Sequence, residues 1–444
     1  MVENFYLKCQ VCGTITRIRL QHGRVRRHPV VITCGKCKVS LSGFVELYPK
    51  VKHEFDNAKE IEHPELTAAD YLAECSGEFP VFKQTSDSSE NIGNITPFMR
   101  LVSRIGDNDK IEEYFDAVNE LSKTQESWSD IKKVFDLSLT DSEYLVPEIK
   151  KVFSGKYFEC RNKIEVLRAV HMFEVHYFYT PLFPMLTENK KRADDFLNLD
   201  PIQMNAMIDV LNNNAGYKLN DLQKAIYKLY GEFIEVYEAF IPAISVQHIG
   251  KENFDFEKEG TSTSSFDTVK QFYLDVYETL GNLLIIPLML DNIKYRNSPI
   301  YFDEEKKITF EDFLKMPKGK RFSICKENEY FTAFIDLKSR TKIRNSIGHN
   351  DVEYDAVTQV VTYTPNPADR TKQKNIYLLE YEMEALDMFN SVLAISEYIY
   401  KIKQVKLIHE DDTFIRELGK KIDPYALCPC CSGKKYKFCH GKKN

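Results

Sequence analysis

The chain has 444 residues, of which 43% are hydrophobic and 28% charged, and its 60 basic and 66 acidic residues give a formal net charge of −6. This globular composition excludes a largely disordered chain, and at about 100–200 residues per domain it predicts two to four domains. The longest purely apolar run, residues 283–290, is too short to cross a bilayer that needs roughly 20 residues, so we expect no membrane partner. The first ten residues lack the basic start and apolar stretch of a secretion signal, which predicts a cytoplasmic protein.

The charge is distributed unevenly along the chain. Residues 1–52 hold ten basic and two acidic residues, a net charge of +8, and the last eleven residues hold five lysines and no acid. Basic segments attract phosphate backbones through counterion release, so nucleic acid is the first partner to consider. The alternative is that these charges only solvate small modules. The candidate nucleic-acid-binding residues are Arg24, Arg26 and Arg27.

Residues 1–52 predict a small β zinc ribbon, because short β-like runs (14–20, 30–34 and 43–51) alternate with cysteine pairs. Each CxxC pair can present two thiolates from one tight turn, and two pairs complete the tetrahedral sulfur shell of structural zinc. Glycines at 13 and 35 suit such turns, which often need unusual backbone dihedrals. A closed four-thiolate site leaves no coordination position for catalysis. The predicted ligands are Cys9, Cys12, Cys34 and Cys37.

Residues 53–95 are acidic and then rich in Ser and Asn, which predicts a linker. From 96 to 261 we expect a helical domain of unknown role, with apolar residues recurring every three or four positions in segments such as 108–122 and 219–240. Prolines, Pro242 among them, are expected to end or kink several of these helices. The sequence HMFEVHYFY at 171–179 has two histidines around Glu174, but its aromatic surroundings favour core packing over metal binding.

The segment 262–408 predicts a second helical domain. A helix through 269–290 is followed by a helix from about 329 to 347, a β-hairpin at 352–364 and a long last helix with an apolar stripe from Leu379 to Tyr400. The whole chain is therefore expected to be mainly α, a helical bundle flanked by small zinc modules.

The sequence RNSIGH, residues 344–349, carries the chemistry of a candidate catalytic site. Histidine can act as base or acid near neutral pH, and an arginine fork matches phosphate oxygens. Asn345 and His349 are four residues apart and share a helix face, where the amide could orient the imidazole. The alternative is that Arg344 only stabilises a helix C-terminus and His349 is an ordinary loop residue.

This segment resembles the R-N-x-x-x-H signature of HEPN domains, which are helical modules of many prokaryotic RNases, toxins and antiviral proteins. The resemblance implies a HEPN-like bundle over 262–408 that dimerises, so that two motifs form one composite site. It implies RNA cleavage by 2′-hydroxyl attack without a catalytic metal, leaving a 2′,3′-cyclic phosphate and a 5′-hydroxyl. The catalytic residues would be Arg344, Asn345 and His349, and Asp275 and Glu278 are candidate acidic helpers.

The C-terminal segment 409–444 predicts a linker and a second zinc module. Its sequence CPCCSGKKYKFCH resembles the SEC-C motif, a short zinc module known from the C-terminal tail of the preprotein translocase motor. Cys431 departs from the motif, which usually has glycine there. The resemblance implies docking on a partner protein or a ribosome, and the alternative is a simple C-terminal staple. The implied ligands are Cys428, Cys430, Cys439 and His440.

Two functions follow as hypotheses. The first is a homodimeric HEPN endoribonuclease, a toxin or anti-phage effector acting on tRNA, mRNA or ribosome-associated RNA, with two structural zinc ions and no catalytic metal. The second is a non-catalytic scaffold that binds nucleic acid or protein through its zinc modules. Cleavage that depends on His349 separates the two.

Overall fold

The computed structural model describes most of the chain and divides it into two compact units. The residues described are 1–47, 50–62, 69–86, 95–153, 159–182, 193, 199, 201–300, 308–324, 328, 330, 338–366, 368–410, 423–425, 434–438 and 441–442. The first unit comprises Met1–Gln125, Glu232–Asp275 and Lys338–Asp387, and the second comprises Glu126–Gly231, Val276–Leu337 and Met388–Asn444. The chain is mainly helical with small sheets, as its sequence predicted.

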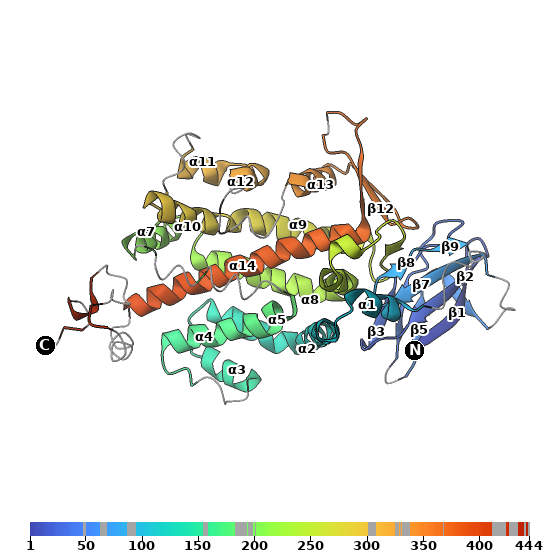
Figure 1. Ribbon diagram of the computed structural model, residues 1–444, viewed down its shortest axis with the longest axis horizontal. Coiled ribbons are helices and arrows are strands. Elements are labelled where there is room, and N and C mark those ends of the chain that lie inside the picture. The colour runs from blue at the N-terminus through green and yellow to red at the C-terminus, as the bar shows by residue number, and fades with distance from the viewer. Residues whose placement is uncertain are drawn as a thin grey trace. The chain divides into compact units, whose positions relative to one another are not determined.

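The first unit begins with a β-rich region built from two sheets (Figure 1). The five-stranded sheet has the order β6-β1-β2-β7-β9 and the three-stranded sheet the order β3-β4-β5. Apolar residues from both sheets, such as Leu7, Ile18 and Val45, form one buried cluster, which is what alternating apolar side chains produce on a sheet face. The bounds are β1 Val2–Cys9, β2 Ile15–Gln21, β3 Arg27–Val30, β4 Gly43–Glu46, β5 Lys52–Phe55, β6 Ala58–Ile61, β7 Tyr71–Ser76, β8 Val81–Phe82 and β9 Thr85–Ser86.

The linker predicted over 53–95 instead contains strands that complete these sheets. β5 pairs with β4, β6 pairs with β1, and β7 lies parallel to β2. The turn between β5 and β6 contains Asn57, whose φ of 53° is one that asparagine tolerates better than most residues. The polar composition concealed these strands because their side chains are half exposed, and because the charge within β7, Glu74, is buried against Arg100. The predicted ribbon is therefore one part of a larger β region.

A buried histidine in this region makes its stability depend on pH. His28 in β3 is fully buried, and burial, together with the neighbouring His22, lowers its pKa to about 4. The unfolded chain then binds more protons than the folded one between pH 6.5 and 4, so stability is lost as the pH falls through this range. At pH 5 the loss from this residue is expected to be about 2 kcal/mol. Urea unfolding of wild type and His28→Phe at pH 7 and pH 5 measures it, and an equal pH dependence in both proteins would refute it.

The helices and strands of the first unit that follow agree with the predicted order. α1 and the start of α2 are followed by the end of α8, by β10, by the start of α9, by α13, by the sheet β11-β12-β13 and by the start of α14. The predicted hairpin is confirmed as β11 and β12, and β13 adds a third antiparallel strand. The bounds are α1 Pro97–Ile105, α2 Asn108–Ser138, α8 Leu219–Ile249, β10 Glu259–Gly260, α9 Phe266–Leu283, α13 Lys338–Gly348, β11 Val352–Asp355, β12 Val360–Tyr363, β13 Lys374–Tyr377 and α14 Leu378–Glu410, of which α2, α8, α9 and α14 contribute residues to both units.

Two predictions about single helices have different outcomes. The apolar stripe of the last helix is confirmed, since residues from Leu379 to Tyr400 along it are buried in α14. Pro242, in contrast, does not end its helix, because α8 continues for seven residues beyond it to Ile249.

The segment Phe266–Arg296 is long and apolar enough to span a membrane by length and composition, yet 72% of its most apolar window is buried, as in a core helix.

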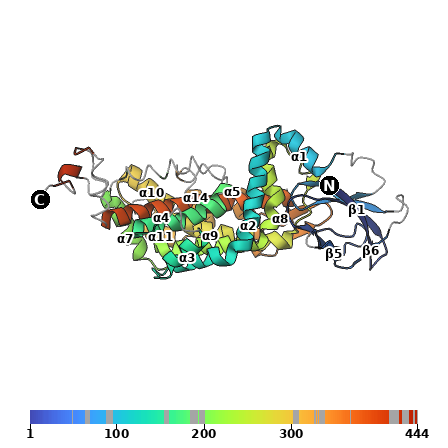
Figure 2. The same cartoon turned by 90° about the horizontal axis from the view of Figure 1, so that it is seen from below.

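The second unit is helical, and α4 lies beside the C-terminal part of α14 in both views (Figures 1 and 2). The paired helices are joined by His171, whose Nε2 lies 3.0 Å from Glu397 Oε2 and whose ring stacks on Tyr400. The bounds are α3 Leu145–Val152, α4 Lys163–Glu174, a π-helical segment Val175–Tyr179, α5 Thr180–Leu182, α7 Pro201–Asn212, α10 Ile285–Arg296, α11 Phe310–Lys315 and α12 Lys318–Ile324.

The HMFEVHYFY segment packs into this core. Glu174 is buried, and its carboxylate accepts hydrogen bonds from three tyrosine hydroxyls, from Ser396 and from Gln223. A buried carboxylate needs this number of donors to offset its lost hydration. The aromatic residues around Glu174 are thus hydrogen-bond partners as well as packing, and the three tyrosines are Tyr179, Tyr227 and Tyr230.

Candidate functional site

The four N-terminal cysteines come together at one end of β1. Their sulfur atoms all lie within 4.8 Å of one another, with 3.7 Å between Cys9 and Cys37 and 3.5 Å between Cys12 and Cys34. A tetrahedral zinc site with Zn–S bonds of about 2.3 Å places its sulfurs about 3.8 Å apart. The distances and the all-sulfur donor set therefore fit zinc, and the cluster could hold one zinc ion.

The two CxxC turns, residues 9–12 and 34–37, are here called the first and second knuckle, and the same local hydrogen bonds stabilise both. The amide of Gly13 donates to the carbonyl of Cys9, and the amide of Lys38 donates to the carbonyl of Cys34. In each knuckle the residue after the second cysteine has a positive φ, 76° at Gly13 and 63° at Lys38. The prediction for Gly13 is thus confirmed, whereas the left-handed position of the second knuckle falls on Lys38.

Gly35 is needed for a different reason from the one predicted. A Cβ atom at this position would lie 2.4 Å from the ring of Tyr71, which is closer than side chains pack. Tyr71 belongs to β7, so Gly35 allows the second knuckle to approach the sheet. We expect Gly35→Ala to displace this knuckle and to weaken zinc binding, and Gly13→Ala to do so through its φ. A competition titration against a zinc chelator measures both effects.

The hydroxyl of Thr14 prepares one of the thiols for metal binding. It lies 3.2 Å from the sulfur of Cys12, and this hydrogen bond is the main cause that lowers the pKa of Cys12, whereas burial and the neighbouring thiols raise the pKa of Cys37 in the same cluster. Zinc binds the thiolate and not the thiol, so a lowered pKa favours the ligand form at neutral pH.

The second predicted zinc module has its ligands outside the residues that the structure describes, namely Cys428, Cys430, Cys439 and His440, as does Cys431. Between them, residues 436–438 form a short 3-10 helix. The amide of Gly441 donates to the carbonyl of Tyr436, and that of Lys437 donates to the carbonyl of Pro424. Two lysines of this segment lie over the ring of Tyr425, with Lys437 Nζ 3.6 Å and Lys435 Nζ 5.8 Å from its centre.

The three arginines proposed for nucleic acid binding are exposed, but each already has a neighbour. Arg24 lies over the ring of Phe115, and Arg27 lies over the ring of Phe44. Arg26 forms an ion pair with Glu46 at 2.9 Å. Phosphate binding at Arg26 would therefore compete with an existing carboxylate, while the other two guanidinium groups keep their charge on the surface.

The RNSIGH segment forms the last turns of α13. The helix ends at Gly348, the amide of His349 donates to the carbonyl of Asn345, and Asn350 takes the left-handed conformation that ends helices. Gly348 itself is helical, and a Cβ there would make ordinary contact, 3.8 Å from Arg344 Nη1. The helical geometry therefore continues through Gly348, and the left-handed residue lies two positions later, at Asn350.

Two residues that sequence reasoning did not single out hold this helix in place. The hydroxyl of Ser346 is buried and donates to the carbonyl of Thr364 at 2.6 Å, which ties α13 to the end of β12. Arg340 is buried and pairs with Asp387 and Glu384 on α14. The signal for Ser346 was its place inside the motif, and no local pattern marked Arg340.

The three proposed catalytic residues lie together at the C-terminal end of α13. Arg344 and Asn345 are half-buried, and Arg344 Nη1 lies 3.4 Å from Asn345 Oδ1. His349 is exposed. Of the candidate acidic helpers, Asp275 accepts a hydrogen bond from Gln271 and Glu278 pairs with Lys318, and neither contact involves this segment.

Comparison with known proteins finds similarity over a short part of the chain. The protein translocase subunit SecA of Syntrophomonas wolfei is 36% identical over 80 residues, which cover 15% of this chain and 10% of that protein. SecA of Symbiobacterium thermophilum is 35% identical over 83 residues, covering 15% and 9%. The chain thus spans about a tenth of the length of the curated relatives it matches. No family model and no solved structure matches. The similarity to SecA supports a SEC-C-like zinc motif in this chain.

Proposed function

We propose that this protein is a metal-independent endoribonuclease of HEPN type, whose site is completed by a second copy of the chain. The observation that carries the proposal is the end of α13, where an exposed imidazole and a half-buried guanidinium lie on one short stretch of helix. Ser346 and Arg340 hold this helix through their contacts with the end of β12 and with α14, so the position of the helix does not depend on a bound substrate. The order of the long helix α9, the motif-bearing helix α13, the sheet β11-β12-β13 and the long last helix α14 supports a HEPN-like bundle, with α10, α11 and α12 as additional helices between α9 and α13.

The chemistry requires three groups around one phosphodiester. The 2′-oxygen attacks the adjacent phosphorus and gives its proton to a base, the P–O5′ bond breaks, and the 5′-oxygen takes up a proton. Histidine suits both proton transfers, and Arg344 would stabilise the charge on the phosphorane. One chain offers a single histidine in this segment, so a second His349 from a partner copy would supply the other transfer.

The proposed composite site predicts a dimer. We expect a solution mass of twice the 51.8 kDa of one chain. Light scattering across a concentration series measures this, and cleavage should fall more steeply than protein concentration once the dimer dissociates. A protein that cleaves RNA as a monomer would contradict the composite site.

The 2′-hydroxyl is the decisive test of the reaction type. Wild-type protein is incubated with a labelled RNA in EDTA, kept brief enough to spare the zinc sites, and the cleavage position is mapped. The same RNA is then made with a single 2′-deoxy nucleotide on the 5′ side of that position. Cleavage at this position should disappear while cleavage elsewhere continues. Unchanged cleavage of the deoxy substrate would mean that a water molecule attacks the phosphorus.

A binding scaffold is the second candidate, and the exposed Arg24 and Arg27 in the basic β region favour it. In that case Arg24→Ala and Arg27→Ala should weaken RNA binding uniformly and reduce its salt dependence, whereas His349→Ala should change nothing.

A further inference from the structure

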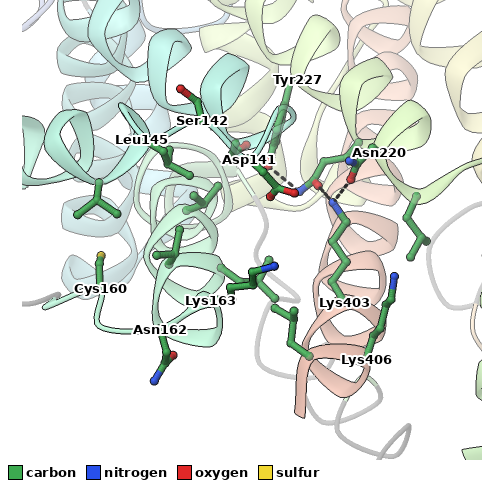
Figure 3. Close-up of a pocket in the computed structure, with 18 of the residues that line it drawn as sticks. Asp141, Ser142, Leu145, Cys160, Asn162, Lys163, Asn220, Tyr227, Lys403 and Lys406 are labelled. Carbon is green, nitrogen blue, oxygen red and sulfur yellow. Dashed lines mark hydrogen bonds between the residues drawn. The ribbon is translucent and has the colours of Figure 1, made fainter. Parts of the chain in front are cut away.

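A cavity of about 620 Å³ lies within the second unit, apart from both the cysteine cluster and the RNSIGH segment. Its wall is formed by the end of α2 and the turn after it, the beginnings of α3, α4 and α8, the last residue of α7, and the C-terminal part of α14 (Figure 3). Ligand sites in proteins usually have volumes between about 300 and 1,000 Å³, so a metabolite-sized molecule fits.

The charged side chains of the cavity are mainly basic. Among the described residues, four lysines and one arginine line it, and Asp141 is the one acid. Arg161 pairs with Glu159 and Glu165, so its charge is largely compensated. The chain as a whole carries a net negative charge, so this group of lysines is a local concentration of positive charge. The ammonium group of lysine is a common phosphate ligand. The lysines are Lys163, Lys218, Lys403 and Lys406.

Three helices also begin at this cavity. Leu145 of α3, Lys163 of α4 and Leu219 of α8 are the first residues of their helices, and all three line the wall. The first amides of a helix have no partner within it, and the helix dipole makes this end positive. The helix starts therefore add to the positive potential that the lysines create, and one acidic residue in each first turn, Glu148, Glu165 and Asp221, offsets part of it.

Lys403 is the residue most directly placed for an anion. Its ammonium group is half-buried and donates to two neutral amide oxygens, Asn220 Oδ1 at 2.7 Å and Gln223 Oε1 (Figure 3). The amide of Gln223 is fixed in turn, because its nitrogen donates to Tyr227 and lies 3.4 Å from Glu174. Lys403 thus lies at the wall of the cavity, and within the part of the chain that the structure describes the hydrogen-bond acceptors of its ammonium group are neutral.

Burial lowers the pKa of Lys403 to about 8, although Glu174 and Asp141 act to raise it, and Lys406 lowers it further. The free protein therefore holds this ammonium group at some cost in stability at neutral pH. An anion bound beside it would restore the usual pKa, so binding should weaken as the pH rises above about 8.

Part of the remaining wall is apolar. Leu145, Val166, Leu219 and Leu407 line it together with the ring of Tyr227. Such a surface favours an apolar or aromatic group on the ligand, because burying it releases water. From the lysines, the helix starts and this wall, we propose that the cavity binds a small phosphorylated molecule that carries an aromatic ring.

Isothermal titration of the full-length chain with adenosine 5′-monophosphate as the probe tests this. Wild type should bind the nucleotide, and bind adenosine and inorganic phosphate at least tenfold more weakly, since each fills only one part of the cavity. Lys403→Met and Lys163→Gln should each weaken nucleotide binding at least tenfold. Lys163 is exposed, so its substitution keeps the fold even if that of Lys403 does not.

Lys224→Met is the matched control, because this lysine is exposed on α8 and does not line the cavity. It should bind the nucleotide as wild type does. Absence of nucleotide binding at millimolar concentration, or equal affinity of wild type and the two cavity variants, would overturn the proposal. Adenosine binding as tightly as the nucleotide would also overturn it, because the cations would then have no role. The outcome does not depend on whether the protein cleaves RNA.

Discussion

Replacing Cys34 by serine is expected to remove one zinc ion per chain and to unfold the β region at temperatures at which wild type stays folded. Cys34 is fully buried and packs with Cys9 and Leu41, so its sulfur is both a ligand and part of a small core. Zinc binding contributes directly to folding in such sites, by about 10–16 kcal/mol in zinc-finger peptides, and losing one of four thiolates forfeits a large share of this.

Metal content and hydrogen exchange measure the effect of Cys34→Ser. We expect residues 2–62 to lose protection while the helices of the second unit keep theirs. The matched control is Cys160→Ser, a half-buried thiol outside the cluster, which should retain the zinc content of wild type. An unchanged zinc content in Cys34→Ser would show that the four cysteines do not form a metal centre.

Replacing His349 by alanine is expected to lower the rate of RNA cleavage by about 10²–10⁴-fold, the usual contribution of a general acid or base. Because the imidazole is exposed, the substitution should leave the melting temperature unchanged. Arg344→Lys keeps the charge but loses the planar fork, so we expect an intermediate loss of rate.

A second histidine provides the control for this experiment. His176 is also exposed, but it belongs to the π-helical segment of the second unit. His176→Ala should cleave RNA at the wild-type rate. Equal rates in His349→Ala and wild type would remove the imidazole from the reaction and favour the scaffold.

The cluster of four cysteines could be predicted from the sequence, because the local geometry of a CxxC turn is the same in many folds. The knuckles, the hairpin β11–β12 and the apolar stripe of α14 all depend on neighbours close in sequence. The strands β5 to β7 could not be predicted in the same way. They are held by pairing with β4, β1 and β2, and their polar side chains follow no strict alternation.

The features that could not be predicted from the sequence depend on partners that are distant in the sequence. Gly35 is required by a tyrosine 36 positions away in the sequence, and Glu174 is stabilised by donors as distant as Ser396. The cavity around Lys403 collects residues from six helices, each of which alone resembles a solvated surface. Local patterns predict turns, caps and faces, but not which distant side chains satisfy a buried charge.

The central claim, metal-independent cleavage by 2′-hydroxyl attack, is tested most directly by the ends of the RNA fragments. Wild type and His349→Ala are incubated with total cellular RNA, briefly in EDTA and in parallel with magnesium. The ends of the fragments are then analysed chemically. The account predicts 2′,3′-cyclic phosphate and 5′-hydroxyl ends with wild type under both conditions, and no fragments with His349→Ala. Fragments that require magnesium, or that carry 3′-hydroxyl and 5′-phosphate ends, would contradict it.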